Sequence, residues 1–128
     1  MITFDTSEVR KLAAELGAIP PQTMPQVRAV LQKGALNIKN DWRARWTGLS
    51  HVPALPYSIT YDTTLLATSA KAEIGPDKGK RQGALGNLIE FGSINNAPHP
   101  GGGPALAAEA PKFEKALADV LGDLVEGQ

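Results

Sequence analysis

Hydrophobic residues recur at steps of three and four along residues 24–49, which is the spacing of an amphipathic helix. Basic side chains occupy many of the positions between them, and Asp41 is the only acid in the segment. Pro25 suits the first turn of a helix, where its missing N–H costs no hydrogen bond. The spacing therefore predicts a long helix with an apolar face and a basic face. Its apolar positions are Met24, Val27, Leu31, Ala35, Ile38, Trp42, Trp46 and Leu49.

A second pattern, the alternation of polar and apolar residues, predicts two strands in the middle of the chain. They cover residues 57–61 and 66–74, and Asp62-Thr63-Thr64 between them is the expected turn of a β-hairpin. The segment that follows, residues 75–83, is polar, basic and rich in glycine. We expect it to be an exposed loop that becomes ordered against a partner.

Further elements are expected at the N-terminal end of the chain. Residues 1–5 alternate weakly, as a short edge strand would. Thr6 or Ser7 offers a hydroxyl that can cap a helix running to about Leu16, and Gly17 then ends it.

The C-terminal part of the chain predicts two helices separated by an irregular segment. Residues 84–91 have the pattern of a short helix that ends in a left-handed cap at Gly92. Prolines and three consecutive glycines exclude regular structure from residues 92–104. Helical spacing resumes at Pro104, and Pro111 is expected to kink or split this last helix.

Together these elements predict an α+β fold. We expect a small antiparallel sheet packed against the long amphipathic helix and the C-terminal helix, forming a single domain over residues 1–128. The 128 residues are 42% hydrophobic and 20% charged, as in ordinary globular domains. The chain contains no cysteine, which excludes a disulfide framework and a thiol nucleophile. No stretch has the pattern of a signal peptide or a membrane span, so we expect a protein made in the cytoplasm without membrane association.

Charge is balanced in total and uneven along the chain. Lys and Arg number 13 and Asp and Glu number 13, which does not favour general binding to nucleic acid. Residues 1–50 hold seven basic and four acidic side chains, whereas residues 101–128 hold two and five. This polarity suits head-to-tail contacts between subunits that can close a ring, although a chance difference between helices explains it equally well.

The residue types that carry chemistry do not form a recognisable site in the sequence. His51 and His99 are the only histidines, both near prolines, and neither has metal-ligand spacing. The glycine-rich segments do not match a phosphate-binding loop, and Ser50 lacks the surroundings of a nucleophile. Glu90 is a conceivable general base, but a glutamate in this position more often caps a helix or forms an ion pair on the solvated face of one. We therefore expect neither an enzyme nor a bound metal or cofactor.

Two further features have alternative interpretations. Trp42 and Trp46 share one helical stripe among arginines, so they either belong to the core or bind a nucleic-acid base or another subunit. Residues 101–103 are consecutive glycines, which form either a hinge for the last helix or an unimportant loop tip.

A resemblance to a known family lies in the second half of the chain. The segments LIEFGS at 88–93, APHP at 97–100 and PAL at 104–106 follow one another in order. Together they resemble the signature of the small head-to-tail connector, or neck and tail-completion, proteins of long-tailed phages. The order of the predicted elements is also similar, so the resemblance covers most of the chain. The glycines at 101–103 replace an aromatic, an aliphatic and a basic residue that the family commonly has, which implies a looser loop.

The resemblance implies a structural virion protein without catalytic residues. Its copies would form a ring, six-fold or a multiple, in the neck between the capsid portal or head-completion proteins and the tail tube or tail terminator. DNA would pass through the lumen without sequence-specific binding. A tail-terminator ring, and a small nucleic-acid-binding or toxin-type protein, are the alternatives. The candidate interface residues are Arg28, Lys39, Arg43, Arg45, Trp46, Lys78, Lys80, Arg81, Glu90, Phe91, Gly92, His99 and Pro104.

Overall fold

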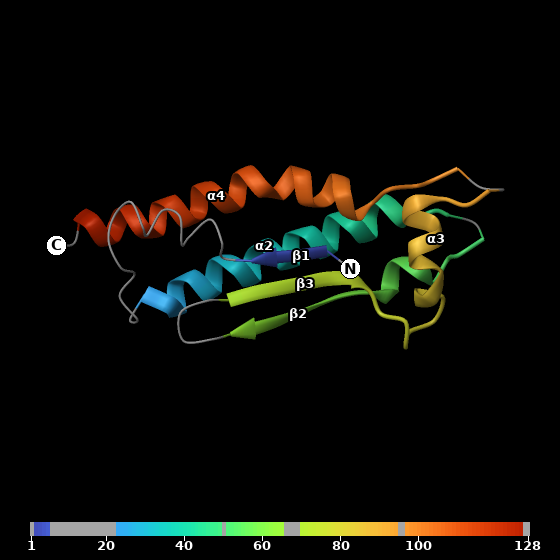
Figure 1. Cartoon of the computed structure of the whole chain (residues 1–128), viewed down its shortest axis with the longest axis horizontal. Helices are drawn as coiled ribbons and strands as arrows, with labels where there is room; N and C mark the ends of the chain where they lie inside the picture. The colour runs from blue at the N-terminus through green and yellow to red at the C-terminus, as the bar shows by residue number, and fades with distance from the viewer. Residues whose placement is uncertain (1, 6–22, 50, 66–69, 95–96, 127–128) are drawn as a thin grey trace.

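A three-stranded sheet and two long helices dominate the computed structural model of the chain (Figure 1). It describes residues 2–5, 23–49, 51–65, 70–94 and 97–126. The strands are β1 (Ile2–Asp5), β2 (Ile59–Leu65) and β3 (Ala70–Pro76). The helices are α2 (Met24–Trp46), α3 (Gly86–Phe91) and α4 (Gly102–Glu126), with short 3₁₀ turns η2 (Leu55–Ser58) and η3 (Gly83–Leu85).

The sheet is antiparallel and has the order β1-β3-β2, so β3 is its central strand. Ile74 of β3 is paired with Ile2 on one side and Tyr61 on the other. The side chains of Ala70, Ala72 and Ile74 are buried, whereas Lys71 is exposed. The alternation expected for this strand is therefore confirmed, as is the short edge strand at the N-terminus.

Helix α2 lies between the sheet and α4, and the two long helices run in opposite directions along the long axis of the molecule (Figure 1). One core cluster includes residues of α2, the sheet and α4. The predicted α+β class is thus confirmed, and α2 supplies much of the core because its apolar stripe faces both neighbours. Its buried residues are Val27, Leu31, Gly34, Ala35, Ile38, Trp42 and Trp46.

The boundaries of the hairpin differ from those predicted. The expected turn at residues 62–64 is wrong, because these residues pair with 71–73 inside the β2–β3 ladder. Thr63 and Thr64 are β-branched and favour an extended backbone, which explains why the strand continues through them. Tyr57 belongs to η2 rather than to the strand. The residues that connect β2 to β3 lie outside the described part of the chain, as does the helix expected at 6–16.

Helix α4 is continuous through Pro111, so of the two outcomes expected there, a kink or a split, the split is wrong. Pro111 is exposed, and solvent can therefore bind the backbone carbonyl that the missing proline N–H leaves free. The helix also begins at Gly102, two residues before the predicted start at Pro104. The two glycines that precede Pro104 are thus part of the first helical turn.

Candidate functional site

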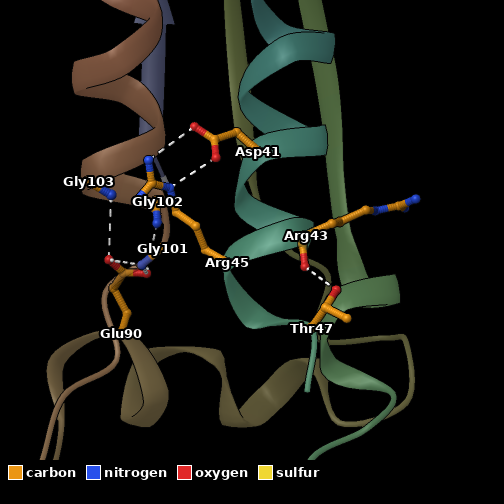
Figure 2. Close-up of polar contacts among 8 residues, drawn as sticks. All are labelled: Asp41, Arg43, Arg45, Thr47, Glu90, Gly101, Gly102 and Gly103. Atoms are coloured by element: carbon orange, nitrogen blue, oxygen red, sulfur yellow. Dashed lines mark hydrogen bonds and ion pairs between the residues drawn. The ribbon is translucent and has the colours of Figure 1, made fainter. Parts of the chain in front are cut away.

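The Glu90 side chain, at the end of α3, caps the N-terminus of α4 (Figure 2). Its carboxylate accepts hydrogen bonds from the backbone N–H groups of Gly101 at 3.0 and 3.1 Å, Gly102 at 3.0 Å and Gly103 at 3.5 Å. The first N–H groups of a helix have no partner within the helix, and the helix dipole favours an anion there. Glu90 therefore fixes α4 to α3, and this contact gives the carboxylate a structural role.

Gly101 lies directly against the two tryptophans of α2. A Cβ atom at this position would lie 2.7 Å from Cδ1 of Trp42 and 2.8 Å from Nε1 of Trp46. Such distances are shorter than real Cβ contacts, so the close approach requires glycine. Gly101 and Gly102 are buried. Because Gly101 packs on the tryptophans and the next two glycines begin α4, the interpretation as an unimportant loop tip is wrong.

The tryptophan pair connects α2 to the segment before α4. The two rings meet edge to face, with centroids 5.4 Å apart and an interplanar angle of 76°. The Trp46 indole donates a hydrogen bond to the His99 carbonyl at 2.9 Å, and the His99 N–H donates to the Ile89 carbonyl at 2.7 Å. Trp46 is only 1% exposed, so its expected role at an interface is corrected to one in the core. The Nε1 atom of Trp42 is buried and has no hydrogen-bond partner among the described residues.

The remaining residues of the motif shape the chain around this contact. Gly92 has a φ of 78° and a ψ of 180°, a backbone conformation that is open almost only to glycine. Its N–H donates to the Leu88 carbonyl at 2.8 Å, which ends α3 where the sequence predicted. Pro104 lies in the first turn of α4, where its missing N–H is not needed. The LIEFGS, APHP and PAL segments thus form one connected unit in space.

Large apolar side chains are exposed on and beside α3. Leu88 is 54% exposed, Phe91 76% and Ile94 102%. Next to them is a groove of about 590 Å³ with an apolar lining that includes Val52, Leu88 and Ile89. We call these three exposed side chains and the adjoining groove the α3 surface. A cluster of exposed apolar side chains of this size marks a contact site more often than a single exposed residue does.

The histidines lie close to this surface without forming a metal site. His51 and His99 both line the groove and both are exposed. Among the described residues, no group of three or more His, Cys, Asp or Glu side chains is arranged to hold a metal ion. Within the same residues, none of the helices combines the length and the hydropathy needed to cross a bilayer.

Most of the basic side chains of α2 that the sequence suggested for an interface contact other residues of the same chain. Arg43 donates from Nε at 3.1 Å and from Nη2 at 2.8 Å to the Ile59 carbonyl at the start of β2. Arg45 pairs with Asp41 at 3.0 Å on the same helix, as Figure 2 shows. The Lys39 ammonium lies 5.4 Å from the centroid of the Tyr61 ring. These contacts give the three side chains structural roles within the subunit.

The other basic candidates are exposed, and most of them lie in one loop. Lys78, Lys80 and Arg81 belong to the segment 77–83, which we call the basic loop. Arg28 lies in α2, at the opposite end of this helix from Trp46. The basic loop is ordered within the single chain by turns, in which Lys80 N–H donates to the Asp77 carbonyl at 3.0 Å. The single chain therefore already gives this loop a defined course. Asp77 and Lys78 line a second pocket together with Asn87 of α3, so the loop adjoins α3.

Sequence reasoning missed the α3 surface and two polar contacts. The sequence predicts a short helix at 84–91 that carries Leu85, Leu88, Ile89 and Phe91, and this pattern gives no sign that Leu88 and Phe91 are exposed. Asn37 of α2 donates to the buried Glu109 of α4 at 3.1 Å, and these residues are too far apart in sequence for any local pattern to pair them. Gln82, with a φ of 63°, accepts a hydrogen bond from the Ala54 N–H at 2.7 Å.

Comparisons of the chain with protein-family models, with curated proteins and with solved structures find no significant match. The geometry of the motif and the α3 surface therefore carry the functional argument.

Proposed function

We propose that this protein is a structural virion component that forms a ring in the neck of a long-tailed phage. The ring joins the capsid portal or head-completion complex to the tail tube and lets DNA pass through its lumen. The resemblance of LIEFGS, APHP and PAL to the connector family supports this proposal. The contacts of Glu90 and Trp46 support it further, because they hold the three segments of the motif together in one place.

The observation that carries the proposal is the exposure of Leu88, Phe91 and Ile94. Burying a large apolar side chain contributes about 1.5–3 kcal/mol relative to leaving it in water. An isolated monomer gains nothing from three such side chains in solvent, whereas an assembled ring removes them from water. Leu88 and Phe91 lie in the LIEFGS segment that carries the resemblance, and Ile94 follows it directly. The same segment therefore holds the subunit together and offers side chains for docking.

The arrangement of basic side chains is consistent with a conduit for DNA rather than a DNA-binding protein. Arg43 and Arg45 are held by Ile59 and Asp41, which reduces their availability to phosphate groups. A protein that binds DNA through phosphate contacts needs many cations on one face. Passage through a channel is favoured by walls that bind DNA weakly.

Light scattering after gel filtration, over a wide range of protein concentrations, tests the proposal. We expect a closed assembly of six subunits or a multiple of six, and electron microscopy should show a ring with an open centre. Binding to double-stranded DNA should be weak and should disappear at moderate salt. A protein that remains monomeric at every concentration, or one that binds DNA tightly with a steep salt dependence, would contradict the proposal.

A further inference from the structure

Strand β2 turns one side of its backbone away from the sheet. In an antiparallel pair, every second residue of a strand directs its N–H and C=O groups at the neighbouring strand. The Asp77 N–H donates to the Ser58 carbonyl at 2.8 Å, which continues the register of β2 and β3 by one pair. The even-numbered residues of β2 therefore direct their backbone groups at β3, whereas those of Tyr61 and Thr63 point outward.

Arg43 supports this orientation and covers only the beginning of the edge. Its two hydrogen bonds to the Ile59 carbonyl show that this carbonyl also faces away from β3. Among the described residues, the outward backbone groups of Tyr61 and Thr63 have no hydrogen-bond partner. Strand β2 contains no proline and its register has no bulge, although such features commonly protect an edge strand. We call the outward backbone groups of Tyr61 and Thr63 the β2 edge.

The other edge of the same sheet is β1. Strand β3 directs the backbone of Ala72 and Ile74 at β1, so the residues of β1 that lie opposite these two face β3. The backbone groups of Thr3 and Asp5 therefore point outward, and we call them the β1 edge. Both edge strands are antiparallel to β3, so they run in the same direction. Figure 1 shows β3 between them.

We propose that the β2 edge of one copy pairs with the β1 edge of the next copy, so that the sheets of adjacent subunits become continuous. This inference rests on the proposed function and names a backbone contact by which the ring closes. Strand addition to an open edge derives its affinity from main-chain hydrogen bonds. Because the two edges are different, the contact is heterologous, and repeating it produces a ring when the rotation closes.

The position of the β2 edge favours a second copy as its occupant. Thr60 of β2 and Asn87 of α3 line the same pocket, so the start of this strand adjoins α3. A neighbour bound along β2 therefore also reaches α3, where the proposed ring has to cover Leu88 and Phe91. One subunit contact then accounts for the open edge and for the exposed side chains.

The charges of the edge strands select a register. Thr3, Glu73 and Asp62 lie in one row across the sheet. Continuing this row into the next copy sets Asp62 beside Thr3 and Thr64 beside Asp5, so no two acidic residues are adjacent. A shift of two residues would place Asp62 beside Asp5, which the repulsion of like charges disfavours.

Proline at position 63 tests the backbone contact. Because this N–H faces outward, T63P should leave the β2–β3 ladder intact and weaken self-association by at least about tenfold in light scattering. The matched control T63A keeps the N–H and should assemble like the wild type. T64P removes an N–H that faces β3, so it should lower the urea midpoint of unfolding, whereas the midpoint of T63P should stay close to that of T63A.

A cysteine pair provides a second readout, since the chain has no cysteine of its own. In the register above, oxidation of T3C/D62C should give a covalent ladder that extends beyond dimers on a non-reducing gel, because each copy is joined to two neighbours. Neither single variant should form such a ladder. Efficient dimers of D62C alone would show that β2 pairs with β2 of another copy, which would overturn the inference.

The outcomes separate this inference from the proposed function. If the wild-type protein and T63P both form rings and T3C/D62C gives no ladder, the edge contact is wrong and the ring remains. If T63P is destabilised as much as T64P, the assignment of the outward N–H is wrong and the inference fails with it. A wild-type protein that stays monomeric contradicts the proposed function itself. Loss of assembly in T63P alone, together with the covalent ladder, is the result that we expect.

Discussion

Glu90 and Phe91 are neighbours in the sequence and have opposite environments. The charged side chain points into the molecule and holds the N-terminus of α4, while the aromatic side chain is 76% exposed. Burial normally favours the reverse, because a carboxylate loses hydration and an aromatic ring gains by leaving water. The backbone N–H groups of α4 compensate the carboxylate for its lost hydration. Within the described part of the chain, nothing covers the ring of Phe91.

This contrast separates two functions between two neighbouring residues of one motif. The contacts of Glu90 hold the single subunit together, and removing them should cost stability. The exposed ring of Phe91 contributes little to the subunit, and removing it should affect association alone. The expected effects on stability therefore decrease from the glycine that packs on the tryptophans, through Glu90 and the arginines of α2, to Phe91.

Substitution of Gly101 with valine should have the largest effect on stability. A Cβ atom there would lie within 3.0 Å of ring atoms of both Trp42 and Trp46, and both rings are buried. We expect a loss of about 3 kcal/mol in the free energy of unfolding, measured by urea denaturation followed by circular dichroism. G103A is the matched control, because no atom lies within 4 Å of a Cβ at that position. Equal stability of the two variants would show that the close packing is not required.

Substitution of Glu90 with alanine should have the next largest effect. The substitution removes an acceptor shared by the N–H groups of Gly101, Gly102 and Gly103, which should reduce the free energy of unfolding by about 2 kcal/mol. Glutamine retains one oxygen acceptor and should lose about half as much. The control E114Q alters an exposed carboxylate on α4 and should be neutral. A neutral E90A variant would contradict the capping role.

A pair of substitutions in α2 tests whether its arginines act within the subunit. R43A removes two hydrogen bonds to the Ile59 carbonyl and should cost about 1 kcal/mol, read from the same urea denaturation curves. R45A removes only an exposed ion pair with Asp41 and should cost about 0.5 kcal/mol. Unchanged stability in R43A would mean that this side chain is free for a partner after all.

The fold was largely predictable because its elements have strong local patterns. The period of α2 and the alternation of β3 arise from one buried face each, and a buried face leaves a regular trace in the sequence. The turn placed at residues 62–64 was wrong because the polar character of Asp62 and its neighbours concealed their pairing with β3. Pro111 did not split α4, because its position on the exposed side of the helix allows solvent to satisfy the free carbonyl.

The site was less predictable because its contacts join residues that are far apart in the sequence. The sequence indicated that Glu90 more often caps a helix or forms an ion pair than acts as a base. It could not show that the helix it caps is α4. The same holds for position 101, where only glycine fits because the tryptophans of α2 lie so close. The pattern of residues 84–91 predicted a short helix with apolar side chains, but whether Leu88 and Phe91 are covered depends on tertiary packing.

The smallest effect on stability is expected for Phe91, and it is the sharpest test of the contrast with Glu90. Since the ring is already 76% exposed, F91S should change the free energy of unfolding by no more than about 0.5 kcal/mol. Its association should nevertheless weaken clearly in light scattering, because the interface loses a large apolar side chain that only a partner can bury. I89S is the matched control: Ile89 packs against the core from the same helix, so this variant should lose stability itself. A Phe91 variant that assembles like the wild type would leave the exposed ring without a docking role, and one that unfolds easily would place the ring in the core.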